Sequence, residues 1–285
     1  MLNKIIKHYH QGTLKSGIWN FILNYSGYRF IKKKIKNLIR IQEINFYVPK
    51  AKCEFELPKI NGICVVYGSA PSAHIPVGYK DSWKIITANS SQWITDNLGL
   101  KKPDISVVCS TSFLHGNSAY EIAYNEGATK ALIGKNTGYL IIAEDKICSD
   151  YRRKIRNKKI LGSINKHQFS FDMIDFLAYA YRYKLSAEVL NDKYFYKVSL
   201  SMGFFCGILA YYLGASPIIM TGFSFTNQYH GYPDDYANKK GGKGEKGRGE
   251  LTGDLRAVEI IKKLNLPFFA ADKVFAEESG LNLWK

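Results

Sequence analysis

Short, continuous apolar runs, each followed by a small or polar residue, constrain the fold of this chain most strongly. Three of them span residues 63–67, 84–88 and 105–109, and the residues that follow are a glycine, an asparagine and a serine. Runs of about five residues that are rich in Val and Ile are typical of strands buried on both faces of a sheet. The sequence therefore predicts parallel strands that are covered on both sides.

Further apolar runs alternate with helical patterns along the rest of the chain. The predicted strands lie at 131–133, 139–143, 217–221 and 266–270, and the predicted helices at 171–183, 203–213 and 255–264. Asp254 is expected to cap the last of these helices. This order predicts an α/β protein with a single Rossmann-like, mostly parallel sheet wrapped by helices.

The first part of the chain is strongly basic. The whole chain has a net charge of +16, and residues 1–50 contain ten Lys or Arg residues against Glu43 alone. Apolar and basic residues recur at helical spacing between residues 28 and 40. We expect a basic helical arm at 1–57 and a catalytic domain at 58–285. The arm is either a helix that packs on the core or an interfacial helix, with residues 1–45 on an anionic membrane surface.

The cysteines and the hydropathy pattern predict a cytoplasmic protein, peripheral on the inner face of the membrane. Five cysteines are scattered without a Cys-x-x-Cys or zinc pattern, and Lys4 and Lys7 interrupt the opening apolar stretch where a secretory signal would lie. The stretch 198–233 has no charged residue, but Gly214 and Pro217 divide it. It is therefore predicted to form a buried helix and a buried strand, because a membrane span needs about 20 apolar residues in one helix.

Ligands of open α/β sheets bind at the carboxyl ends of the strands, so the residues there are the first candidates for a site. The first strand is followed by Gly68-Ser69-Ala70-Pro71-Ser72. The amides of Ser69 and Ala70 could face an anion, and a helix beginning at Pro71-Ser72 would favour phosphate at its N-terminus. This turn has neither the Gly-x-Gly-x-x-Gly pattern of a dinucleotide site nor a Walker P-loop.

Three other residues are candidates on similar grounds. Asn89 follows the second strand, where its amide could read a base or a ribose, or could instead stabilise a turn. Ser201 can cap the helix that follows it, and Gly203 would allow a ligand to approach the backbone closely. Residues 239–249, rich in Gly and Lys, are predicted to form a mobile loop.

These strand ends resemble those of the small bacterial CMP-sialic acid sialyltransferases. In that family the first strand ends in Gly-x-Gly-Pro-Ser and the second in Asn, as at Gly68–Ser72 and Asn89 here. Thr-Ser-Gly, a helix and a strand into Gly-x-x-Phe follow, which correspond here to residues 201–203, the helix ending at 214, and 222–225. The resemblance covers about residues 60–270, although the middle third cannot be aligned by eye.

The resemblance implies a glycosyltransferase that moves an acid sugar, of the sialic acid or Kdo type, from a CMP-activated donor. The acceptor would be an oligosaccharide or glycolipid of a bacterial surface glycan, in lipopolysaccharide or capsule biosynthesis. No metal and no cofactor are implied. The implied donor-binding residues are Gly68, Ser69, Ala70, Ser72, Asn89, Ser201, Gly203 and Tyr232.

This sequence departs from the family at the catalytic base. The family has a His shortly before the Asp that opens its last helix, and Glu250 occupies that place here. Two candidates therefore remain. His230 has an ordinary pKa suited to a base near neutral pH, whereas Glu250 has the better position but needs its pKa raised by burial. Met202 and Thr226 also replace a Ser and a Tyr of the family.

Two other classes of protein compete with a sugar transferase. A nucleic-acid-binding protein is disfavoured, because the positive charge is concentrated in the arm and no helix-turn-helix, RNA-recognition or zinc motif occurs. A nucleotide enzyme of another kind on the same fold, such as a pyrophosphokinase-like transferase, is the main alternative.

Overall fold

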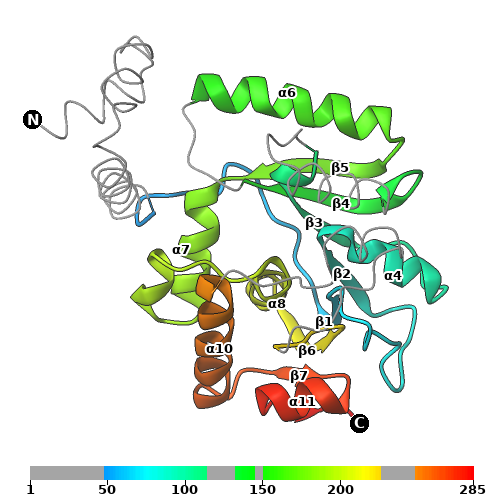
Figure 1. The fold of residues 1–285 in the computed structure, drawn as a ribbon, viewed down its shortest axis with the longest axis vertical. Helices are drawn as coiled ribbons and strands as arrows, with labels where there is room; N and C mark the ends of the chain where they lie inside the picture. The colour runs from blue at the N-terminus through cyan, green and yellow to red at the C-terminus, as the bar shows by residue number, and fades with distance from the viewer. Residues whose placement is uncertain (1–47, 114–131, 145–149, 226–247) are drawn as a thin grey trace, which may run out of the picture.

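The computed structural model describes residues 48–113, 132–144, 150–225 and 248–285, with helices on both faces of one sheet (Figure 1). The sheet has eight strands in the order β5-β4-β3-β2-β1-β6-β7-β8, and every neighbouring pair is parallel. The predicted α/β class, a single Rossmann-like parallel sheet wrapped by helices, is confirmed.

The elements have the following bounds. The strands are β1 (Gly62–Tyr67), β2 (Lys84–Ala88), β3 (Ile105–Cys109), β4 (Asn136–Ala143), β5 (Ser170–Leu177), β6 (Ala215–Thr221), β7 (Phe268–Ala270) and β8 (Asn282–Leu283). The α-helices are α4 (Gln92–Asn97), α6 (Asp150–Lys166), α7 (Tyr179–Val189), α8 (Met202–Tyr212), α10 (Arg248–Lys263) and α11 (Lys273–Ser279). Short 3₁₀ helices are η1 (Asn89–Ser91), η2 (Ser110–Phe113) and η3 (Lys193–Tyr196).

The central strands are apolar because both of their faces are covered. In β1, Cys64 and Val66 pack into the core cluster that contains α7, α8 and α10, whereas Val65 and Tyr67 pack into the cluster with α4 on the other face. All four are fully buried. Successive side chains of a strand point to opposite faces, so a strand buried on both sides reads as a continuous apolar run.

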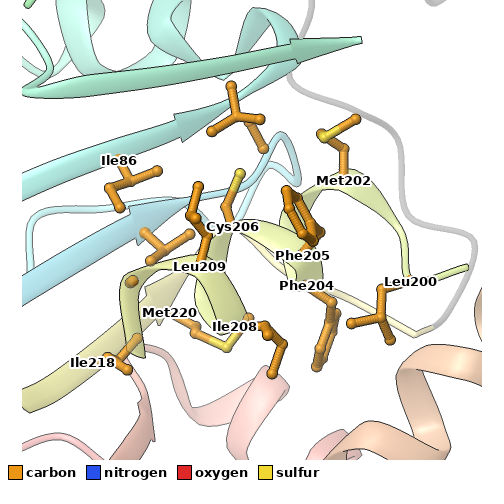
Figure 2. Packing of buried hydrophobic residues seen from close by; sticks show 14 of the residues in the cluster. Ile86, Leu200, Met202, Phe204, Phe205, Cys206, Ile208, Leu209, Ile218 and Met220 are labelled. Atoms are coloured by element: carbon orange, nitrogen blue, oxygen red, sulfur yellow. The ribbon is translucent and has the colours of Figure 1, made fainter. Parts of the chain in front are cut away.

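The uncharged helix α8 is the centre of the larger cluster. Figure 2 shows Phe205, Cys206 and Leu209 on α8 among strand residues that include Ile86 and Met220. The prediction of a buried helix followed by a buried strand is confirmed, with β6 as the strand. No helix in the described part of the chain is both long and apolar enough to cross a membrane.

Two secondary-structure predictions are wrong. Residues 171–177 were expected to begin a helix, but they lie in β5, an edge strand paired with β4, and only the segment from Tyr179 is helical. An edge strand is half exposed, so its mixed polar and apolar residues imitate a helical period. The strand expected at 131–133 is also wrong, because Leu132 ends a helical turn and 133–134 form a turn.

The last part of the predicted arm lies on the domain. Val48 is fully buried against Tyr179 and Tyr183, and the ring of Phe55 makes an edge-to-face contact with Tyr139 at 6.3 Å. Lys184 Nζ donates to the carbonyl of Ala51 at 2.9 Å. Residues 48–57 are therefore anchored to the core, and the rest of the arm, 1–47, lies outside the described residues.

Candidate active site at the carboxyl edge of the sheet

The order of the strands places a switch point between β1 and β6. From β1 the chain adds β2, β3, β4 and β5 on one side, and then returns to pair β6 with the other side of β1. The loops that follow β1 and β6 therefore leave the sheet in opposite directions. Open α/β sheets bind their ligands at the carboxyl ends of the strands at such a point.

The backbones after β1 and β6 remain paired beyond the strands. Gly68 N donates to Thr221 O at 2.8 Å, and Ala70 N donates to Gly222 O at 2.9 Å. A Cβ atom on Gly68 would overlap the Gly222 carbonyl oxygen, so this approach needs glycine. The amide of Ala70, which was predicted to face an anion, is thus already used within the protein.

A single aromatic ring joins three of the predicted motif segments. A Cβ atom on Gly203 would lie 2.5 Å from Cε1 of Phe223, and one on Gly68 would lie 3.3 Å from Cδ2 of the same ring. Gly203 therefore makes room for Phe223, whereas the sequence predicted a close approach of a ligand. The ring packs the start of α8 against the turns after β1 and β6.

Ser201 caps α8 as predicted. Its Oγ accepts from Phe204 N at 3.4 Å, and its own amide donates to Asp254 Oδ1 at 2.9 Å. Asp254 is fully buried and lies inside α10, which begins at Arg248. The prediction that Asp254 caps its own helix is therefore wrong, and the carboxylate instead holds the backbone at the start of α8.

The turn after β1 does not open a helix. Residues 71–72 form a turn in which Ala73 N donates to Ala70 O at 3.1 Å, and no helix begins before η1 at Asn89. The chain is held at the edge by Thr221, whose hydroxyl accepts from His74 N at 3.1 Å and lies 3.2 Å from His74 O. The predicted helix N-terminus for phosphate at Pro71-Ser72 is therefore wrong.

His74 is a site candidate that the sequence analysis missed. Its Nδ1 lies 2.9 Å from the carbonyl of Ser72, and a carbonyl only accepts, so Nδ1 carries the proton. In the neutral ring this leaves Nε2 with a lone pair that can accept a proton or a hydrogen bond. The only signal in the sequence is its position six residues after Gly68.

Asn89 stabilises the backbone and also offers donors. Its φ of 53° is in the left-handed region, which Asn tolerates better than most residues, and its Oδ1 accepts from Cys109 N at 2.9 Å. That hydrogen bond fixes the orientation of the amide. Its Nδ2 group has no hydrogen bond within the described parts of the chain, so its two N–H donors are candidates for a ligand.

Three buried oxygen atoms at this edge have no hydrogen-bond partner among the described residues. They are Ser72 Oγ, Ser90 Oγ and Asp272 Oδ2, which follow β1, β2 and β7. Burial raises the pKa of Asp272, while the Phe275 amide and the charge of His74 act in the opposite direction. Buried polar atoms in native proteins are normally paired, so atoms without a partner mark places where a ligand or water can bind.

A buried cation lies behind the start of α8. Arg182 is only 7% exposed, donates from Nη2 to Leu200 O at 3.1 Å and stands over the ring of Phe205 at 5.6 Å. Within the described residues no carboxylate forms an ion pair with it. The N-terminus of α8 already holds the Asp254 carboxylate, so the guanidinium of Arg182 is the group here that can favour a further anion.

Glu278 of α11 holds the loop that leaves β6. Its Oε2 accepts from Phe225 N at 2.7 Å, and Ser224 Oγ lies 3.2 Å from the same oxygen. Glu278 was not predicted as a site residue, because nothing in the sequence of 273–279 distinguishes its side chain from a solvated carboxylate. It fixes residues 224 and 225 against α11.

Several predicted site residues lie outside the described residues. His230, Tyr232 and the Gly- and Lys-rich segment up to 247 are among them. Glu250 lies in the first turn of α10, with its side chain outside the description. In the part that is described, no group of three or more His, Cys, Asp or Glu side chains could hold a metal ion.

Comparisons with known proteins give structural neighbours only. No protein-family model matches the chain, and no curated protein matches its sequence. In fold, the chain is similar to the monofunctional alpha-2,3-sialyltransferase Cst-I from Campylobacter jejuni, with a TM-score of 0.47 and 15% identity over 82% of this chain and 85% of that one. It is also similar to the sialyltransferase CstII from Campylobacter jejuni in complex with CMP-3FNeuAc, with a TM-score of 0.43 and 13% identity over 79% and 86%.

Proposed function

We propose that this protein is a glycosyltransferase that moves an acid sugar, of the sialic acid or Kdo type, from a CMP-activated donor to a bacterial surface glycan. The observation that carries the proposal is the meeting of the motif residues at the β1–β6 switch point. Gly68 and Gly203 pack against Phe223, Gly222 lies against Gly68, and Asn89 follows the neighbouring strand. These are the segments in which the sequence resembles CMP-sugar transferases.

The site offers groups that suit a nucleotide monophosphate and an acid sugar. Asn89 Nδ2 would donate to a base or ribose, and the hydroxyls of Ser72 and Ser90 lack partners among the described residues. Arg182 would supply positive charge for the phosphate and the sugar carboxylate. Ser69 and Tyr232 complete the proposed donor site, in which Gly68, Ala70, Ser201 and Gly203 shape the backbone.

The proposed reaction is a displacement at the anomeric carbon of the donor sugar. The acceptor hydroxyl oxygen forms a bond to that carbon, and the bond from the carbon to the phosphate oxygen breaks, with the electron pair leaving on CMP. A base takes the hydroxyl proton as the new bond forms. His230 and Glu250 are the proposed bases, and the geometry adds His74, whose Nε2 can accept a proton.

The reaction is proposed to need no metal. The Arg182 guanidinium would stabilise the negative charge of the departing phosphate. This side chain is buried and donates to Leu200 O, which restricts its movement.

Residues 1–45 are proposed to hold the enzyme on the inner face of a membrane that contains anionic lipid. Each basic residue near such a surface contributes about 1 kcal/mol of binding free energy. Deletion of residues 1–45 should therefore release the protein from anionic vesicles, and added salt should weaken binding of the full chain. Equal sedimentation of the two chains with vesicles would show that the arm is structural only.

Thermal unfolding with nucleotides tests the proposed donor class. CMP should raise the unfolding temperature in the presence of EDTA, and UDP, GDP and ATP should have little effect at equal concentration. Stabilisation by UDP but not CMP would contradict the donor assignment. Stabilisation by ATP alone would favour a pyrophosphokinase-like enzyme.

A further inference from the structure

Helix α6 has an inner face that is fully engaged with the domain. Arg156 Nη2 donates to Ser110 Oγ at 2.6 Å, and Arg153 Nε lies 3.1 Å from the buried Glu144 carboxylate. Ile160 and Ile164 of the same helix are buried in the core cluster on β4. The position of α6 on the sheet is therefore explained by its inner face alone.

The outer face of α6 carries only positive charge. It presents four exposed lysines, Lys154, Lys158, Lys159 and Lys166. None of them makes a hydrogen bond or an ion pair with any described residue. At 3.6 residues per turn they span an arc of about 140°, and Ile155, which is 42% exposed, lies inside this arc.

In two other helices of this protein a lysine has an acidic partner one turn away. In α7, Lys184 lies 3.6 Å from Glu188, and in α11, Lys273 lies 3.8 Å from Glu277. In α6 the single acidic residue is Asp150, at the first position of the helix. Lysines one turn apart repel each other, as between Lys154 and Lys158, so folding of the helix does not explain an all-cationic face.

We propose that the outer face of α6 is a docking surface for a membrane rich in anionic lipid. The helix has 17 residues and is about 25 Å long, and it forms the outer border of the domain beside β4 and β5 (Figure 1). A convex helix face of this length meets a flat surface with all four lysines, whose aliphatic chains can lie along the headgroups around Ile155.

The position and chemistry of this face separate it from the proposed sugar site. Strands β2, β3 and β4 lie between the switch point at β1 and the edge strand β5, so the face is not part of that site. Its described exposed side chains include no aromatic ring on which a nucleic acid base could stack. The inference does not depend on the proposed sugar transfer.

The test compares two full-length variants with the same loss of charge. The first changes the four lysines of the outer face of α6 to Gln: Lys154, Lys158, Lys159 and Lys166. The matched control changes four other exposed lysines to Gln. They are Lys193 in η3, Lys197 directly after η3, and Lys262 and Lys263 in α10. Exposed lysines without partners tolerate such changes, and circular dichroism would confirm that both variants fold.

Sedimentation with vesicles of phosphatidylserine and phosphatidylcholine gives the readout. We expect the α6 variant to bind at least about tenfold more weakly than the wild type and the control variant to lose less than about threefold. Vesicles of phosphatidylcholine alone should bind none of the three proteins. Equal weakening of both variants, or no weakening of the α6 variant, would overturn the proposal. The proposal would also be overturned if the α6 variant lost binding to single-stranded DNA but bound the vesicles as strongly as the wild type.

Discussion

At the amino edge of the sheet, the carboxylate of Asp104 accepts from Ile85 N and Lys84 Nζ, both at 2.9 Å, and Lys101 Nζ lies 3.2 Å away. At the carboxyl edge, Ser72, Ser90 and Asp272 each have a buried oxygen without a partner among the described residues. The same strands connect both edges. The Asp104 carboxylate at the amino edge is used in stabilising hydrogen bonds, whereas these oxygens at the carboxyl edge remain available to bind a ligand.

The polar groups between the two edges follow the pattern of the amino edge. Ser106 Oγ lies 2.7 Å from Thr87 Oγ1 and 2.9 Å from Thr137 Oγ1, and Gln92 Oε1 accepts from it at 3.2 Å. Gln92 Nε2 in turn donates to Asn136 O at 2.5 Å. This buried network is satisfied across three strands and one helix. In the cluster on the α4 face, by contrast, the buried hydroxyls of Tyr67 and Tyr79 have no partner among the described residues.

The largest expected effect concerns the base at the carboxyl edge. We expect one of three variants, His230→Ala, Glu250→Gln or His74→Gln, to lose about a hundredfold or more in transfer rate, or about 2.7 kcal/mol in activation free energy. That variant should still be stabilised by CMP, because the base acts on the acceptor hydroxyl. Near wild-type rates in all three would show that none of them is the base.

Asn89 tests binding at the same edge with the backbone conformation retained, although each variant loses the hydrogen bond to Cys109 N. Asn89→Gly removes the amide but tolerates the positive φ, and we expect CMP to bind about ten- to thirtyfold more weakly, for the loss of one or two hydrogen bonds. The change in unfolding temperature with CMP measures the effect. Asn89→Ala should lose the same binding and also some stability, because alanine disfavours this backbone conformation.

Asp104 tests the stabilising role of the amino edge. Burial alone would raise the pKa of Asp104, but hydrogen bonds from Lys84 and Ile85 and the charge of Lys101 hold it below its ordinary value. Asp104→Asn should therefore lower the free energy of unfolding by about 1–2 kcal/mol at pH 7. The stabilisation by this carboxylate is present above its unfolded pKa and is lost as the pH falls through the folded pKa, so the two proteins should converge in acid.

Urea unfolding measures that difference, with the CMP-dependent stabilisation as the control. The CMP effect should be the same in Asp104→Asn and the wild type, because the two edges lie at opposite ends of the strands. Loss of the CMP effect in this variant would contradict the separation of the two edges.

A matched pair of serines gives the smallest expected effect. Ser106 and Ser90 are both almost fully buried, but among the described residues the hydroxyl of Ser106 has hydrogen-bond partners and that of Ser90 has none. Ser106→Ala should destabilise the protein by about 1–2 kcal/mol, whereas Ser90→Ala should change its stability by less than about 0.5 kcal/mol or increase it. Equal destabilisation in urea would show that Ser90 Oγ is bonded in solution.

The sequence predicted the central sheet well because its strands are buried on both faces. The apolar runs of β1, β2, β3, β4 and β6 were identified, as was the buried helix α8. The edge strand β5 was mistaken for a helix, because only one face of an edge strand has to be apolar. Helices α4, α6 and α11 and strand β8 were missed. The short elements have too few apolar residues to show a period, and α6 contributes only Ile160 and Ile164 to the buried cluster on β4.

The sequence predicted where the site lies better than it predicted which contacts the site residues make. Strand ends follow directly from the apolar runs, so Gly68, Asn89 and Ser201 were identified by their place in the chain. Contacts between distant segments leave no local pattern. The packing of Gly203 on Phe223 and the capture of Ser201 N by Asp254 therefore became visible only in the fold. His74 was missed for the same reason, since its neighbours Thr221 and Asp272 lie far away in the sequence.

Transfer of an acid sugar from its CMP donor tests the central claim most directly. The full-length protein would be incubated in EDTA with CMP-sialic acid, CMP-Kdo or UDP-glucose and an oligosaccharide acceptor, with released nucleotide and glycan mass measured together. We predict release of CMP from one of the two CMP donors and a gain of one acid sugar for each CMP released. The proposed function would be contradicted if the protein transfers sugar from UDP-glucose, consumes neither CMP donor and is not stabilised by CMP.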